Sequence, residues 1–261
     1  MRLGSREPLK PGDEGYTKAP NVLDSGIAEK RAESEPEAKA AAKAIQKAPA
    51  RAAAVPAAPK GKATRATLET GKMPALPGAD EPAIALIESA SIAIGYLVAD
   101  TIVKKAPVRL LRAQTVSPGK FIVLYTGDVA SVEEAHAAGK AAVAESLIDE
   151  LLLPNVHETV LPALEGLTTE ATLDSFGIIE TFSFASTILA ADTAVKAAPV
   201  RLIEVRTPAG LGGKSFLTLS GGLEDLQAAM TQALDRIRPG GMICRYVLIP
   251  NPHSDLHPFV F

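Results

Sequence analysis

Residues 85–110, ALIESASIAIGYLVADTIVKKAPVRL, recur further along the chain as residues 177–202, GIIETFSFASTILAADTAVKAAPVRL. At a constant offset of 92, fifteen of the 26 positions are identical, including Ile-Glu, Ala-Asp-Thr, Val-Lys and Ala-Pro-Val-Arg-Leu. The likeness continues with small insertions, since SPGKFIVLYTGD at 117–128 matches LGGKSFLTLSGG at 211–222. Two copies of roughly 85 residues are long enough to be tandem domains, whereas a solenoid would need three or more shorter repeats.

Each copy predicts the element order β-α-β-β-α-β. In the first copy, Ser89 or Ser91 can cap a helix with apolar residues at helical spacing, Lys104-Lys105 suits its C-terminal end, and Pro107 ends it. Two apolar, β-rich runs joined by a Ser-Pro-Gly turn then make a hairpin. Strands are expected at Ala85–Glu88, Val108–Thr115, Phe121–Tyr125 and Leu151–Leu153 with a second helix at Val132–Leu147; the second copy has strands at Gly177–Glu180, Val200–Arg206, Phe216–Leu219 and Ile243–Ile249 and helices at Ala185–Lys196 and Glu224–Arg236.

Split βαβ units of this kind give an antiparallel sheet covered by helices. The predicted fold class is therefore α+β, with two tandem βαββαβ domains of the ferredoxin-like pattern at 83–165 and 174–261. In residues 1–80, by contrast, Leu, Ile, Val and Phe number nine, or 11%. Because a core is not expected below roughly 20%, we expect residues 1–82 to be a disordered tail rich in Ala, Pro, Lys and Glu.

One part of this tail favours a short helix. Glu35-Pro36-Glu37 suits a first turn, AKAAAKAIQK continues it, and Pro49 ends it. The apolar face is small, so the helix is either solvated or docks on a partner protein.

The overall composition excludes several classes of protein. A net charge of −3 is too near neutral to predict nucleic-acid binding, and the single cysteine, Cys244, excludes a disulfide framework and an all-cysteine metal site within one chain. No stretch reaches about 18 consecutive apolar residues, and the N-terminus lacks the apolar segment of a secretory signal. These features predict a cytoplasmic protein that binds neither membrane nor nucleic acid.

Few residues suggest catalysis or cofactor binding. The run Gly212-Gly213-Lys214-Ser215 resembles part of a phosphate-binding loop, but that loop would need a glycine where Pro208 stands and a following helix instead of the expected strand. His157 and His253 follow Pro-Asn at equivalent repeat positions, which favours a turn or edge packing over metal binding. Cys244 is expected to be a small core residue of a strand. We predict no enzyme activity, no cofactor and no metal.

Two acidic residues stand four positions before a lysine, Asp100 before Lys104 and Asp192 before Lys196. This spacing predicts ordinary ion pairs along one helix face.

The repeated motifs carry a resemblance to a known family. Each copy has Ile-Glu, then Ala-Asp-(x)3-Lys followed by Ala-Pro-Val, then a Gly-containing hairpin loop and a final Pro-x-x-His, at LPNVH (153–157) and IPNPH (249–253). This pattern resembles bacterial microcompartment shell proteins over residues 83–261, and the duplication resembles their tandem-domain members. The resemblance implies a structural protein of the microcompartment shell. A homotrimer would form a pseudohexagonal tile with a central pore for metabolites and would contact other shell proteins, both hexamers and pentamers. The N-terminal tail could then bind an encapsulated enzyme.

The resemblance also assigns residues to the pore and to the edges of the tile. The pore loops are Val116, Ser117, Pro118, Gly119 and Lys120 in the first copy and Gly210, Leu211, Gly212, Gly213 and Lys214 in the second. The edge residues are Lys104, Asn155 and His157 in the first copy and Lys196, Asn251 and His253 in the second.

The pore lysines have two interpretations. Lys120 and Lys214 could give six ammonium groups near the trimer axis, which would favour anions, or they could turn away and pair with carboxylates.

Two other interpretations of the whole chain also stay open: a ferredoxin-like trimer that binds a regulatory ligand, and an enzyme.

Overall fold

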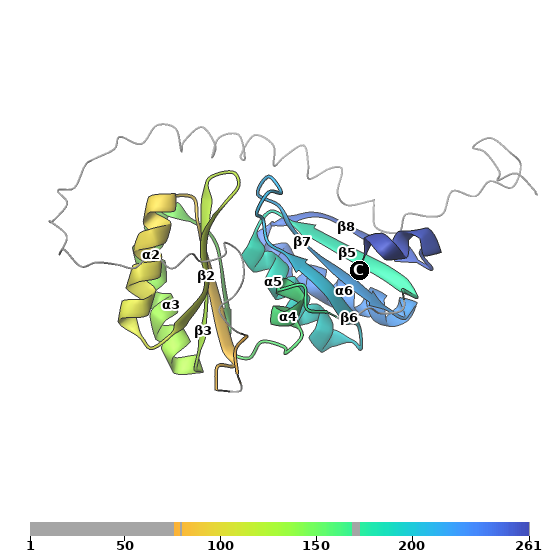
Figure 1. Ribbon diagram of the computed structural model, residues 1–261, viewed down its shortest axis with the longest axis horizontal. Helices are drawn as coiled ribbons and strands as arrows, with labels where there is room; N and C mark the ends of the chain where they lie inside the picture. Colours follow the sequence, from red (N-terminus) through yellow and green to blue (C-terminus); the bar gives the residue numbers. More distant parts are fainter. Residues whose placement is uncertain (1–75, 79, 169–172, 261) are drawn as a thin grey trace, which may run out of the picture. The chain divides into compact units, whose positions relative to one another are not determined.

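The computed structural model describes residues 76–78, 80–168 and 173–260. The disordered tail expected over 1–82 and its short helix therefore fall almost wholly outside the described residues. Both repeats lie in one compact unit, Ala66–Phe261, and each forms a four-stranded antiparallel sheet with helices (Figure 1). The α+β prediction is confirmed. None of the described helices is long and apolar enough to cross a membrane.

The first domain contains the elements of the first repeat. Its sheet has the strand order β2-β3-β1-β4, and all three pairings are antiparallel. The elements are β1 (Ala83–Ser89), α2 (Ile92–Lys105), β2 (Arg109–Val116), β3 (Lys120–Gly127), α3 (Val129–Val143) and β4 (Leu147–Leu153).

The second domain repeats this plan with the order β6-β7-β5-β8, again antiparallel throughout. A short helix, α4 (Val160–Leu164), follows the first domain, and a 3-10 helix, η3 (Ser254–Phe259), follows the second. Neither short helix was expected from the sequence. The elements are β5 (Ser175–Thr181), α5 (Phe184–Ala197), β6 (Arg201–Arg206), β7 (Ser215–Gly221), α6 (Leu223–Ile237) and β8 (Ile243–Pro250).

Local signals explain how the first helix of each repeat begins and ends. The Ser91 hydroxyl accepts the backbone N–H of Ile94, and the Ser183 hydroxyl accepts that of Ser186, so both serines are N-caps. Helix α2 ends at Lys105, before the expected proline.

The end of the second helix was predicted incorrectly. The expected helix Val132–Leu147 stops at Val143, and a 3-10 turn over Ala144–Ser146 leads into β4, which begins at Leu147 and not at Leu151. Leu147 pairs with Ser89 of β1. The hydrogen bonds of the sheet thus outweigh the helix propensity of this alanine-rich segment.

The first sheet is buried on both faces. Every residue of β1 is buried, because α2 and α3 cover one face and the second domain covers the other (Figure 1). On the helix side, Ile87 and Phe121 pack with Val98 and Ile102. On the opposite face, Leu86 and other apolar side chains belong to one core with α5 of the second domain. We call the sheet face opposite a domain's own helices its receiving face.

A buried polar chain distinguishes the first domain from the second. The Tyr125 hydroxyl lies 2.8 Å from His136 Nδ1, and His136 Nε2 lies 3.3 Å from Glu150, which also accepts from Lys140. Burial lowers the pKa of His136 and raises that of Tyr125. The equivalent positions in the second domain are mostly apolar: Leu219, Met230, Leu234 and Tyr246.

Candidate functional site

The two hairpin loops expected at the pore meet in the structure. Hairpin loop 1 is Val116–Lys120 and hairpin loop 2 is Gly210–Lys214. A Cβ atom on Gly213 would lie 2.8 Å from Cδ of Pro118 and 3.3 Å from the Ser117 carbonyl oxygen. Gly213 also has a φ of +88°, a conformation that glycine adopts without strain. Glycine is therefore required here both by the backbone conformation and by the close approach of the other domain's loop.

This contact leads to a prediction for Gly213→Ala. The methyl group should be strained at positive φ, by roughly 1–2 kcal/mol, and should also push hairpin loop 1 away. The matched control is Gly210→Ala, because Gly210 has a φ of +75° but open space around its Cα. In thermal unfolding, Gly213→Ala should lose about 1–3 kcal/mol more stability than Gly210→Ala. Equal losses would show that the two loops do not press on each other.

Both lysines expected at the pore extend from the base of their loop toward a carboxylate. Lys120 Nζ donates to the Phe182 carbonyl at 2.9 Å and lies 3.8 Å from Glu88 Oε2. Lys214 Nζ lies 3.3 Å from Glu180 Oε1, and this bond raises the pKa of Lys214. The remaining residues of hairpin loops 1 and 2 carry no charge.

Cys244 lies beside the second of these pairs. It is in β8 as expected, but it is partly exposed instead of belonging to the core. Burial and the neighbouring Glu180 carboxylate raise the pKa of its thiol.

Glu88 holds the start of α5 from the other domain. The carboxylate is fully buried, and its Oε1 accepts the backbone N–H of Ala185 at 2.8 Å. The first N–H groups of a helix lack partners within the helix, so a carboxylate there acts as a second cap. Asp149 adds to the contact by accepting from the hydroxyls of Ser183 and Ser186. The sequence marked Glu88 only as part of a repeated motif, because its burial depends on the other domain.

The opposite end of α5 is held by three of the expected edge residues. Lys196 Nζ donates to the Asn155 carbonyl at 2.5 Å and to Asp192 at 2.7 Å. Asp192, which is buried, accepts the backbone N–H of His157 at 2.8 Å. The expected ion pair of Asp192 and Lys196 is present and is also part of the contact between the domains.

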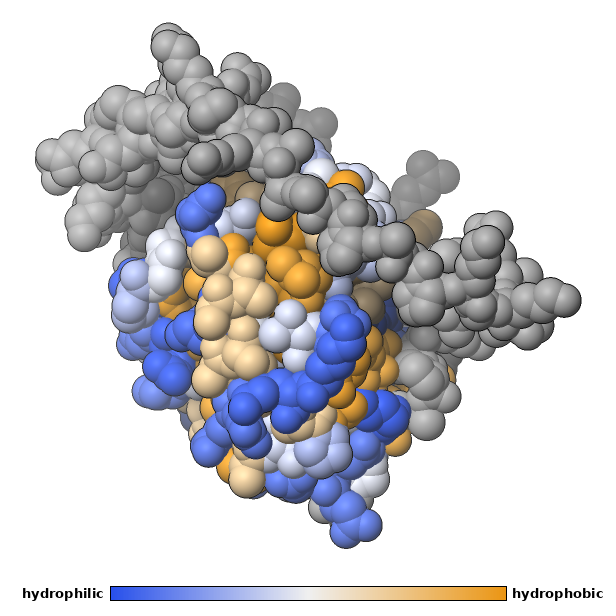
Figure 2. Space-filling view, turned by 90° about the vertical axis from the view of Figure 1, so that its left-hand side faces the viewer, coloured by the Kyte–Doolittle hydropathy of each residue, from blue (hydrophilic) through white to orange (hydrophobic). Residues whose placement is uncertain are grey.

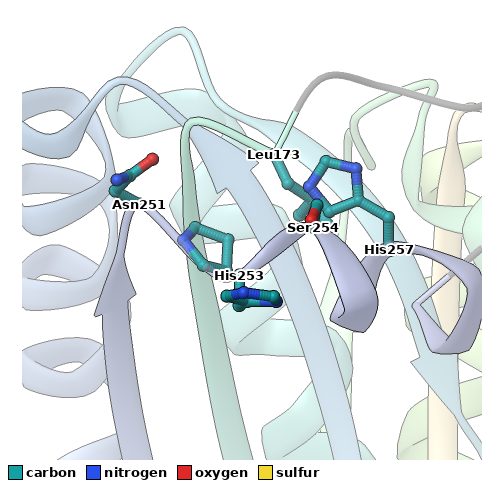
Figure 3. A pocket seen from close by; sticks show the side chains of 6 residues that line it. Leu173, Asn251, His253, Ser254 and His257 are labelled. Atoms are coloured by element: carbon teal, nitrogen blue, oxygen red, sulfur yellow. The ribbon is translucent and has the colours of Figure 1, made fainter. Parts of the chain in front are cut away.

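Of the other three edge residues, Lys104 is on α2, and Asn251 and His253 follow each other closely after β8. Lys104 pairs with Asp100 at 2.6 Å on an exposed helix face. Figure 3 shows Asn251 at the end of β8 and His253 on the segment that follows. Together with Leu173, Pro252, Ser254 and His257, they line a hollow of about 440 Å³.

A second hollow, of about 540 Å³, lies over the receiving face of the second domain. Phe176, Ile178 and Glu180 line it, and they occupy the repeat positions of Ile84, Leu86 and Glu88. In the first domain those positions are covered by α5. Both hollows of the second domain therefore lie at positions that, in the first domain, contact α5. The first hollow corresponds to the region of His157, and the second corresponds to the region of Glu88.

Helix α2 has an exposed apolar surface of the kind that could pack on the receiving face of the second domain. Ile92 and Tyr96 are 40% and 62% exposed, whereas their repeat equivalents in α5, Phe184 and Ile188, are fully buried. Leu97 and Val103 are also exposed. Figure 2, which looks onto the side of Figure 1 where α2 and α3 lie, shows apolar side chains gathered in a band bordered by hydrophilic ones. An apolar helix face next to polar surface is typical of a protein interface.

Comparisons with known proteins agree with these features. The family described as "BMC domain" matches residues 83–156 and 175–252. The bacterial microcompartment shell protein PduT of Citrobacter freundii is 40% identical over 174 residues, which cover 67% of this chain and 95% of that protein. The carboxysome assembly protein CcmO of Synechococcus elongatus is 28% identical over 171 residues, or 60% of this chain and 61% of that protein. The crystal structure of a microcompartment protein from Desulfitobacterium hafniense DCB aligns with a TM-score of 0.60 and 46% identity, covering 68% of this chain and 98% of that one.

Proposed function

Since the chain belongs to the BMC-domain family and is a shell protein of a bacterial microcompartment, we propose that three copies form a trimeric tile. The tile would contain six domains around a central pore. The observation that carries the proposal is the contact between the two domains of one chain. The receiving face of the first domain holds α5, whereas the receiving face of the second domain is covered only in part by the C-terminal segment that contains η3, and helix α2 keeps apolar side chains exposed.

A second copy of the chain is the occupant that fits the open face. Because the two domains are repeats, α2 of one copy can pack on the second domain of another as α5 packs on the first domain. Such a head-to-tail contact uses two different surfaces, so it closes into a ring when the rotation allows. With two domains per chain, three chains complete six similar positions.

The intrachain contact gives the polar bonds expected between chains. Glu180 would cap the start of α2 as Glu88 caps α5. The backbone N–H of His253 would donate to Asp100 as that of His157 donates to Asp192. Lys104 would donate to the Asn251 carbonyl as Lys196 donates to that of Asn155. The residues that would form these three bonds are exposed or partly exposed in one chain.

Hairpin loops 1 and 2 would border the pore of this tile. Gly119 occupies the repeat position of Gly213, and a Cβ atom there would meet open space. In the ring, Gly119 would face Leu211 and Gly212 of the next chain, as Gly213 faces Ser117 and Pro118 of its own.

We propose that this pore favours small uncharged metabolites and has no preference for anions. The support is the position of Lys120 and Lys214, whose ammonium groups lie beside carboxylates, whereas the loop tips offer a serine hydroxyl and backbone N–H groups. Neutralising Lys120 and Lys214 by Lys→Met should therefore change entry of an anionic and of a neutral solute into intact shells by the same factor, within about twofold. Lysine and methionine side chains have similar length, so the packing of the aliphatic part is preserved. A selective loss of anion entry would instead place the lysines in the pore.

Electron microscopy of the purified chain tests the tile itself. Flat hexagonal arrays or closed polyhedra, with a threefold particle as the repeating unit, are expected. Isolated particles that bind a small ligand and never form arrays would favour the ferredoxin-like regulatory trimer. Shell proteins also assemble with other shell components, so mixing the trimer with hexameric and pentameric shell proteins is the second arm of the test.

A further inference from the structure

The carboxyl group of Glu88 is an unusual buried charge. Its side chain is 0% exposed. Oε1 accepts the Ala185 N–H, but Oε2 has no hydrogen-bond donor within reach in the described part of the chain. A buried carboxylate oxygen without a donor is costly as long as the group is ionised.

The charges around Glu88 compensate it incompletely. From β3, Lys120 Nζ lies 3.8 Å from Glu88 Oε2, which is beyond hydrogen-bond distance, and it donates a hydrogen bond to the Phe182 carbonyl instead. From β4, the Asp149 carboxylate brings a second negative charge. From α5, the backbone N–H groups at the helix start supply a partial positive charge. Two carboxylates therefore share one ammonium group and one helix end.

We propose that Glu88 forms a proton-sensitive contact between the two domains of one chain, and that this contact is most stable when the carboxyl group is protonated. Protonation removes the uncompensated charge on Oε2 and the repulsion from Asp149, while the other oxygen still accepts the N–H of Ala185. The inference does not depend on the trimer, because every group involved belongs to one chain.

The direction of the pKa agrees with this geometry. Burial raises the pKa of Glu88 from 4.5 to about 7, opposed by the Ala185 N–H and Lys120 and reinforced by Asp149. When the domains separate at this point, the carboxyl group returns to water and its ordinary pKa. Opening therefore releases a proton between pH 4.5 and pH 7, and the contact weakens as the pH rises through that range.

The second domain provides a matched comparison. At the repeat position of Asp149 stands Arg245, and Glu180 already has Lys214 at 3.3 Å. Glu180 thus has a cation, Arg245, as its cross-strand neighbour where Glu88 has an anion, Asp149. The proton response should belong to Glu88 alone.

Hydrogen exchange of the full chain, read by mass spectrometry on peptides covering 182–190, tests the proposal. After correction for intrinsic exchange, protection at the start of α5 should fall about tenfold between pH 6 and pH 8 in the unaltered chain. Glu88→Gln should remove this fall, since its amide cannot ionise, and Glu180→Gln should keep it. Protection that stays constant in the unaltered chain, or a fall that persists in Glu88→Gln, would overturn the proposal.

A second variant guards against a folding defect in Glu88→Gln. Asp149→Asn removes the neighbouring negative charge and keeps an acceptor for Ser183 and Ser186. It should shift the midpoint of the protection change to lower pH, because ionised Glu88 is then less repelled. An unchanged midpoint, or one that moves to higher pH, would contradict the proposed electrostatics.

Discussion

Tyr96→Glu should convert the proposed trimer to monomers at micromolar concentration. In the proposed ring, Tyr96 takes the place that Ile188 has in the contact within the chain, where the side chain is fully buried. A carboxylate there would lose its hydration without a partner, which costs roughly 3–5 kcal/mol at each interface. The dissociation constant of each contact should therefore rise by at least about a hundredfold, and sedimentation velocity would measure the shift.

The single chain should tolerate the same substitution. Tyr96 is 62% exposed within one chain, and its ring contacts the Phe121 ring at a centroid distance of 4.7 Å. Losing that contact should cost about 1 kcal/mol of unfolding free energy. The control is Ala137→Glu, at an exposed position on α3, which should leave the trimer intact. Trimers that persist in Tyr96→Glu while the fold is retained would contradict the proposed interface.

Exchanging both lysines expected at the tile edge for alanine, Lys104→Ala with Lys196→Ala, should abolish extended sheets and shells. The resemblance to the family predicts that the stem of each lysine lies at the rim of the tile, against the neighbouring tile, while its ammonium group bonds within the tile as that of Lys196 does. Three chains carry two such lysines each, so the small loss at one edge recurs at every edge of every tile. Electron microscopy should then show isolated particles where the unaltered protein forms arrays.

The trimer itself should survive this double substitution. Lys104 pairs with Asp100 on an exposed helix face, and such pairs contribute only about 0–1 kcal/mol. Lys196 pairs with the buried Asp192, so its loss weakens a contact within one chain, which the covalent link between the domains keeps in place. Lys105→Ala is the matched control, because Lys105 is the next residue, is 46% exposed and pairs with Glu134 instead. Arrays of normal extent from the double variant would remove both lysines from the tile edge.

Local sequence signals accounted for most of the fold. Ser91 and Ser183 cap helices through bonds that span three residues, and the β-rich runs on either side of the Ser-Pro-Gly turn form a hairpin, so each could be predicted within one segment. The start of β4 could not, because Leu147 is held by Ser89 of a distant strand. The short helix α4 was missed for the same reason, since its residues are buried in a core that spans both domains.

The sequence predicts where the residues of the candidate site lie better than it predicts their hydrogen-bond and ion-pair partners. The repeat alignment placed Lys120 and Lys214 beside their glycine-rich loops, yet their carboxylate partners come from β1 and β5. Asn155 and Lys196 are 41 residues apart, and no local pattern joins them. The burial of Glu88 likewise depends on α5, which lies almost a hundred residues further along the chain.

The covalent link between the two domains changes how a tile responds to dilution. Half of the six contacts in the proposed ring lie within a chain, where the linker keeps the partners at an effective concentration in the millimolar range. Only the other three obey mass action, so assembly requires an encounter of three molecules where a ring of single domains requires six. The permanent contact can thus carry an imperfectly compensated group such as Glu88, whereas the contact formed on encounter has Arg245 and Lys214 near its carboxylate to guide the approach of the next chain.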